Sequence, residues 1–173
     1  MNQIPPSISE LTLAATPNAV AWARRHTVDI LQRWRFPTEG IEVARLLVSE
    51  LATNAIQHVR LAEMSETAAE SASIGTILLR LWPTDGGIIL AVSDPDPRPP
   101  VPRADDASAT GGRGLVLIQA MANRWGYFPS QPLTGKVVWA EVPSHPRAGL
   151  RESGGPGITP LVMGRALVAL RDL

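Results

Sequence analysis

The stretch EVARLLVSELATNAIQHVR, residues 42–60, decides the fold of this chain. At about 100° per residue, its apolar residues fall on one helical face and most of its polar residues on another. Glu50, Asn54 and His58 follow each other at intervals of four, so a helix stacks them on one line at the edge of the apolar face. A carboxylate and a carboxamide there suit a site that holds a metal ion and orients a base. Taken alone, this helix agrees equally well with ordinary hydrogen-bonded surface residues.

The composition indicates one domain with short extensions. The chain has 173 residues, of which 45% are hydrophobic and 18% charged, enough for one sizeable core. Its 16 basic and 16 acidic residues give a formal net charge of zero, which argues against non-specific nucleic-acid binding. The absence of cysteine excludes thiol catalysis, disulfides and cysteine zinc sites. Because the chain shows neither a signal-peptide pattern nor an apolar run of roughly 18 residues, we expect a cytoplasmic protein without a membrane segment.

The rest of the chain alternates between helical and strand patterns. Apolar residues at helical spacing predict two more helices, and apolar runs between turn residues predict hairpins and an edge strand. The expected helices cover residues 17–34, 42–60 and 115–123, and the expected strands residues 11–14, 74–82, 88–92 and 135–142, with one more following Trp125. We therefore expect an α+β, two-layer sandwich, with a mostly antiparallel or mixed sheet of four to five strands and helices on one face.

The domain boundaries follow from changes in composition. Residues 1–10 are expected to be an N-terminal lead and residues 11–143 the folded domain. Residues 144–158 have the glycine and proline content of a linker. Residues 159–173 predict an amphipathic helix, whose apolar face would dock on this domain, on a second copy or on a partner.

A proline-rich stretch and the glycines after it indicate a binding loop. The prolines of SDPDPRPPVP, residues 93–102, forbid both a helix and a central strand, and a long loop inside a compact domain is more often functional than accidental. Gly112, Arg113 and Gly114 then open the third helix. Backbone N–H groups at a glycine-rich helix start form an anion site, although a tight loop-to-helix turn is the simpler alternative.

The order of these motifs resembles that of a known superfamily. In sequence they are Glu50 and Asn54 on a helix, Asp94 at a strand end, a flexible loop, and Gly112-Arg113-Gly114 at a helix start. This order resembles the Bergerat-fold ATPases, which include the ATP-binding domains of gyrase B, heat-shock chaperones, mismatch-repair proteins and histidine kinases. The fragments SELATNAIQH, DPDPRPP and GGRGL are most similar to the bacterial anti-sigma factor branch, whose members are serine/threonine kinases of partner-switching systems.

The resemblance implies ATP and Mg²⁺ as ligands and gives roles to the matched residues. Asn54 is expected to bind the Mg²⁺ that bridges the phosphates, and Glu50 to act as the catalytic base. Asp94 is expected to accept a hydrogen bond from the adenine amino group. The residues expected on the phosphate side are Gly112, Arg113 and Gly114.

Other polar residues have structural interpretations or depart from the family pattern. His58 is expected to be a packed, hydrogen-bonded histidine, and Lys136 a solvated lysine at a strand edge. Asp96 stands where many relatives have glycine, and an inward carboxylate there would repel nucleotide phosphates. The tryptophans are expected to anchor the core or an interface, and they are Trp22, Trp34, Trp82, Trp125 and Trp139.

The resemblance therefore predicts an ATP-binding regulator of the anti-sigma type. It would phosphorylate serine or threonine on an anti-sigma factor antagonist protein and sequester a sigma factor, and the resemblance also allows a homodimer. The alternative is a non-catalytic, nucleotide-dependent protein-binding switch, in which ATP orders the loop. A histidine-kinase output domain is a third hypothesis, disfavoured because no separate helical hairpin carries a phospho-accepting histidine.

Overall fold

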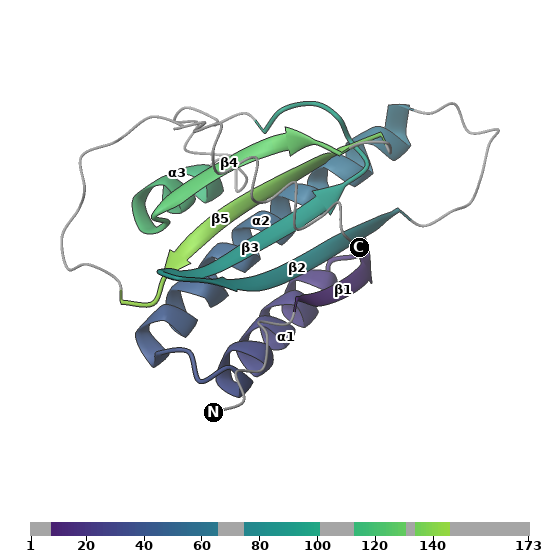
Figure 1. Cartoon of the computed structure of the whole chain (residues 1–173). Coiled ribbons are helices and arrows are strands. Elements are labelled where there is room, and N and C mark those ends of the chain that lie inside the picture. The colour runs from purple at the N-terminus through teal and green to yellow at the C-terminus, as the bar shows by residue number, and fades with distance from the viewer. Residues whose placement is uncertain (1–7, 66–74, 101–112, 131–133, 146–173) are drawn as a thin grey trace.

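The computed structural model describes residues 8–65, 75–100, 113–130 and 134–145 (Figure 1). Gly112, most of the N-terminal lead, most of the expected linker and the expected helix at 159–173 lie outside these residues. The expectations for those segments remain predictions.

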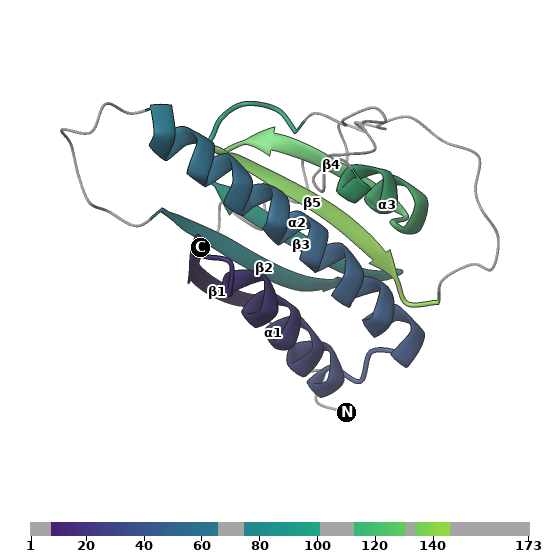
Figure 2. The same ribbon diagram turned by 180° about the vertical axis from the view of Figure 1, so that it is seen from behind.

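Within the described residues, an antiparallel sheet carries three helices on one face (Figures 1 and 2). The strands are β1 (Ser9–Ala14), β2 (Thr76–Thr84), β3 (Gly87–Asp94), β4 (Arg124–Pro129) and β5 (Lys136–Pro143). The helices are α1 (Ala19–Arg33), α2 (Thr38–Ser65) and α3 (Arg113–Met121). The strand order is β1-β2-β3-β5-β4, and every neighbouring pair is antiparallel. The expected α+β sandwich is confirmed, with five strands.

The helix that organises the sequence is longer than expected. α2 has 28 residues and extends past both ends of the 42–60 stretch. The N–H of Ile41 donates to the carbonyl of Pro37 at 3.0 Å, so Thr38 is the first helical residue. None of the described helices is long and apolar enough to cross a membrane.

The other two helices start at different residues from those expected. α1 begins at Ala19 because Pro17 and Asn18 form a turn, in which the N–H of Ala19 donates to the carbonyl of Thr16 at 3.0 Å. Asn18 takes the N-cap position without a side-chain hydrogen bond. α3 begins at Arg113, two residues before the expected start, so Gly114 lies inside its first turn.

The main core lies between α2 and the inner face of the sheet. α2 runs across this face with α1 beside it (Figure 2). Alternate residues of the central strands point toward the helices, as the two-residue period of a strand requires. The residues at the centre of this core are Leu47, Val48, Leu51, Leu79, Leu81, Leu90, Val92, Val138 and Ala140.

The outer face of the sheet carries a second apolar cluster. It consists of Ile89, Ala91, Phe128, Val137 and Trp139, with Trp82 packed against it. Trp34 and Trp125 pack against the inner core instead, whereas Trp22 is 59% exposed and belongs to neither cluster.

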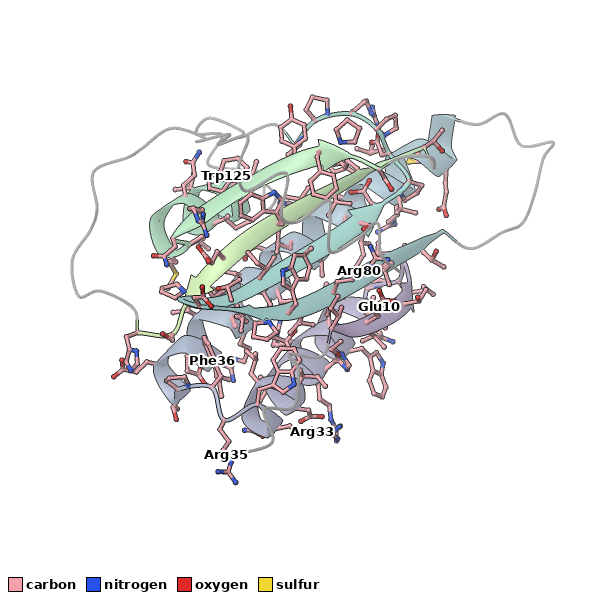
Figure 3. All side chains as sticks on the ribbon, in the orientation of Figure 1. Glu10, Arg33, Arg35, Phe36, Arg80 and Trp125 are labelled. Atoms are coloured by element: carbon pink, nitrogen blue, oxygen red, sulfur yellow. The ribbon has the colours of Figure 1, made fainter. Side chains whose placement is uncertain are left out.

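An ion pair links β1 and β2 at one side of the sheet (Figure 3). It joins Arg80 and Glu10, whose Nε and Oε1 atoms lie 2.8 Å apart.

Candidate functional site

The line of polar residues on α2 lies at the edge of the core, as the sequence predicted. Glu50, Asn54 and His58 are each half-buried, whereas the adjacent Leu51 and Ala55 are buried in the core. Because the three polar residues are one helical turn apart, the rigid helix fixes their spacing. α2 therefore presents a carboxylate, an amide and an imidazole along one edge.

One end of this line lies against the start of α3. A Cβ added to Gly114 would lie 2.6 Å from Oε2 of Glu50 and 3.4 Å from the amide nitrogen of Asn54. Glycine is thus the residue that leaves room for the Glu50 carboxylate. The first turn of a helix has unpaired backbone N–H groups and the positive end of the dipole, so the start of α3, beside Glu50 and Asn54, is chemically suited to an anion. Arg113 starts this turn.

Glu50 has the environment of a proton acceptor. Burial raises the pKa of its carboxyl group above the ordinary value. Among the described residues, its side chain has no hydrogen-bond or ion-pair partner. A carboxylate with a raised pKa and free oxygens is suited to accept a proton from a bound hydroxyl group or water.

A buried ion pair lies where β3 ends and β5 begins. Asp94 and Lys136 are opposite each other in the strand register, and Nζ of Lys136 lies 2.9 Å from Oδ1 of Asp94. Lys136 also donates to the carbonyl of Asp96 at 3.0 Å, and both ion-paired side chains are only 1% exposed. The expectation of a solvated edge lysine was therefore wrong. β5 lies between β3 and β4, so Lys136 is not at an edge of the sheet.

The carboxylate of Asp96 is hydrogen-bonded to two side chains. Its carboxylate accepts a hydrogen bond from Nη2 of Arg98 at 2.7 Å and lies 3.0 Å from Nδ1 of His58 on α2. The hydrogen bond from Arg98 is the main cause that holds the pKa of Asp96 well below its usual range. His58 is hydrogen-bonded, as expected. Asp96 is 3% exposed, and the positive charge of Arg98 balances the carboxylate that we expected to repel phosphates.

The partners of Asp96 predict a loss of stability in acid. Because its pKa is lowered in the folded state, Asp96 stabilises the fold fully above about pH 5, and this contribution is lost as the pH falls below about 4. Asp96→Asn is expected to flatten the dependence of unfolding free energy on pH in that range, measured by urea denaturation. Asp85→Asn, in the exposed β2–β3 turn, is the control that should keep the wild-type slope. An unchanged slope in Asp96→Asn would contradict the ionised network.

The described residues contain no protein-only metal cage. No group of three or more histidine, cysteine, aspartate or glutamate side chains in this part of the chain is arranged to hold a metal ion. Mg²⁺ is commonly bound through one or two protein oxygens together with phosphate oxygens and water. Asn54, beside the start of α3, fits that mode because its amide offers one oxygen.

The structure brings together three of the predicted site residues and adds others. Glu50, Asn54 and Gly114 meet at one end, while Asp94 lies with Lys136 at the end of β3. The sequence interpretation missed the pairing of Lys136. The alternation of residues along the strand could have indicated that Lys136 is buried, because Lys136 lies on the same face as the core residues Val138 and Ala140.

Comparisons with known proteins agree with the fold. The crystal structure of the RsbU and RsbW domains of Rv1364c from Mycobacterium tuberculosis is similar to the chain, with a TM-score of 0.53 and 18% identity. The match covers 86% of this chain but 35% of that one, and at this identity it shows a shared fold. Among curated proteins, no sequence matches significantly. A family model, the histidine kinase-like ATPase domain, matches residues 13–141 and so includes every site residue described above. The chain therefore belongs to the histidine kinase-like ATPase domain family.

Proposed function

We propose that this chain is an ATP-binding regulator of the anti-sigma type. In this proposal it transfers the γ-phosphoryl group of Mg·ATP to a serine or threonine of an antagonist protein, and in another state it sequesters a sigma factor. Membership of the ATPase family supports nucleotide binding. The similarity of SELATNAIQH, DPDPRPP and GGRGL to the anti-sigma branch supports the partners.

The observation that carries the proposal is the close approach of Gly114 to the side chains of Glu50 and Asn54, which leaves little room for a Cβ. The first turn of α3, which begins at Arg113, and the preceding residue Gly112 would bind phosphate oxygens, and Asn54 would hold Mg²⁺. Mg²⁺ bound there supplies positive charge that neutralises the phosphates. Glu50 would accept the proton of the attacking hydroxyl group as its oxygen bonds to the γ-phosphorus and ADP leaves.

In the same proposal, Asp94 would recognise the nucleobase of the bound nucleotide. Lys136 and the N–H of Asp96 both donate to Oδ1 of Asp94. Its Oδ2 atom is thereby left to accept a hydrogen from the adenine amino group. A carboxylate fixed at a strand end favours adenine over a base that lacks this donor, because the unpaired buried acceptor is costly.

Nucleotide binding is tested by calorimetric titration of Mg·ATP. Asn54→Ala is expected to weaken binding at least about tenfold, or about 1.4 kcal/mol, because it removes the amide oxygen that would hold Mg²⁺. Gln57→Ala is the matched control, since Gln57 is an exposed amide on the same helix and should leave affinity unchanged. Wild-type protein that binds no Mg·ATP would contradict the proposal, as would equal affinity in both variants.

Catalysis is tested separately with Glu50→Gln. This variant keeps the size of the side chain but removes the proton acceptor. It is expected to keep Mg·ATP affinity while transfer of labelled γ-phosphate to a serine-containing antagonist domain falls about 10²–10⁴-fold. Transfer that is unchanged in the variant would remove Glu50 as the base. No transfer by either protein, with ATP-dependent binding of the antagonist kept in both, would favour the non-catalytic switch.

A further inference from the structure

We propose that Lys136 determines nucleobase specificity by keeping Asp94 ionised. An ionised Asp94 can only accept hydrogen bonds, and so it pairs with an amino group on the purine. This inference rests on the proposed nucleotide binding. It assigns a role to a buried residue that takes no part in phosphate or metal binding as described above.

The geometry fixes the ammonium group against one carboxylate oxygen. Lys136 begins β5 directly opposite Asp94, the last residue of β3. Its Nζ donates to Oδ1 of Asp94 at 2.9 Å and to the carbonyl of Asp96 at 3.0 Å. With both side chains 1% exposed, water does not screen the pair. The carboxylate is therefore oriented as well as paired.

The charge state of Asp94 decides which base it can recognise. An ionised carboxylate only accepts hydrogen bonds, whereas a protonated carboxyl group also donates one. Adenine has an amino donor at the position where hypoxanthine has a carbonyl acceptor. An accept-only Asp94 thus favours adenine, and a protonated Asp94 would accommodate hypoxanthine. Burial raises the pKa of Asp94, and the hydrogen bond and charge of Lys136 oppose that rise.

The other charged groups nearby have their own partners. The carboxylate of Asp96 is bound by Arg98 and His58, and the backbone N–H of Asp96 donates to Oδ1 of Asp94. His58 acts on Asp94 only as a more distant charge. Among the described residues, Lys136 is the only cationic side chain hydrogen-bonded to Asp94. Lys136 is thus the group whose removal should change the protonation of Asp94.

The test compares Mg·ATP with Mg·ITP, the inosine nucleotide, in calorimetric titrations of the full chain between about pH 6 and about pH 9. Wild-type protein is expected to prefer ATP throughout. In Lys136→Met, ATP affinity at neutral pH should fall at least about tenfold, and the preference for ATP over ITP should largely disappear. As rising pH ionises Asp94, that preference should return. Lys136→Arg keeps the positive charge and should keep the preference. Repeating the profiles in a His58→Gln background removes any contribution from imidazole titration.

The outcomes separate this proposal from the proposed function. Wild-type protein that binds neither nucleotide contradicts nucleotide binding itself. Wild-type protein that binds ATP, together with a folded Lys136→Met variant that keeps the wild-type preference at every pH, overturns only the role of Lys136. If Lys136→Met does not fold, carbon-13 NMR of the Asp94 carboxyl group in wild type and Lys136→Arg decides the question. Titration of that group between about pH 5.5 and about pH 8 overturns the proposal, and a constant ionised signal supports it.

Discussion

Asp94→Asn is expected to lower the free energy of unfolding by about 3–5 kcal/mol, because it leaves a buried ammonium group without its counter-ion. The side chains of Asp94 and Lys136 are each only 1% exposed, so water cannot take the place of the missing carboxylate. Removing one partner of a buried ion pair costs far more than the intact pair contributes. Since many domains are stable by only about 5–15 kcal/mol, the variant should be markedly sensitive to urea.

Two further variants show whether the unpaired charge is the cause. The double variant Asp94→Asn, Lys136→Met removes both charges, while the amide oxygen of the new side chain can still accept the hydrogen bond from the N–H of Asp96. It should therefore recover most of the lost stability. Asp85→Asn makes the same chemical change at an exposed turn and should stay within about 0.5 kcal/mol of wild type. A loss below about 1 kcal/mol in Asp94→Asn, or no recovery in the double variant, would contradict a buried ion pair. Weak ATP binding by Asp94→Asn alone therefore cannot be attributed to base recognition until its stability is known.

The features that depend on local periodicity were predictable from the sequence. The apolar spacing of residues 42–60 placed Glu50 and Asn54 at the edge of the core, where the structure has them. Alternating and apolar runs likewise located the two hairpins. Helix starts were less predictable, because nearby backbone hydrogen bonds make α1 begin after residue 17 and α2 before residue 42.

The interactions that depend on strand order were not predictable from local sequence. Lys136 seemed to be at an edge because nothing local showed that β5 inserts between β3 and β4. The contact of His58 with Asp96 was not predictable for a similar reason, since the two residues are 38 positions apart along the chain. Arg98, whose positive charge balances the Asp96 carboxylate, is only two positions away along the chain, so that pair was open to inference from local sequence.

The close approach of β5 to the end of β3 depends on Gly135. Its φ of +135° is rarely adopted by residues with side chains, and a Cβ there would overlap the carbonyl oxygen of Asp94 and lie 3.0 Å from Cα of Pro95. The obstructing atoms are backbone, so no side-chain rotation relieves the overlap. The carbonyl of Gly135 also accepts a hydrogen bond from the N–H of Ser130 at 2.9 Å, which ties its position to the residue that follows β4.

Gly135→Ala is therefore expected to destabilise the fold by about 2–5 kcal/mol, combining backbone strain with overpacking. Gly86→Ala is the matched control, because no atom beyond its two chain neighbours lies within 4 Å of the added Cβ and Gly86 lacks a positive φ. It should change stability by no more than about 0.5 kcal/mol in the same urea titration. In the fraction of Gly135→Ala that folds, displacement of Asp94 from Lys136 should also weaken Mg·ATP binding, whereas Gly86→Ala should bind as wild type does. Equal stability of the two variants would mean that β5 does not approach Asp94 as closely as described, and the Lys136 pairing would lose its structural basis.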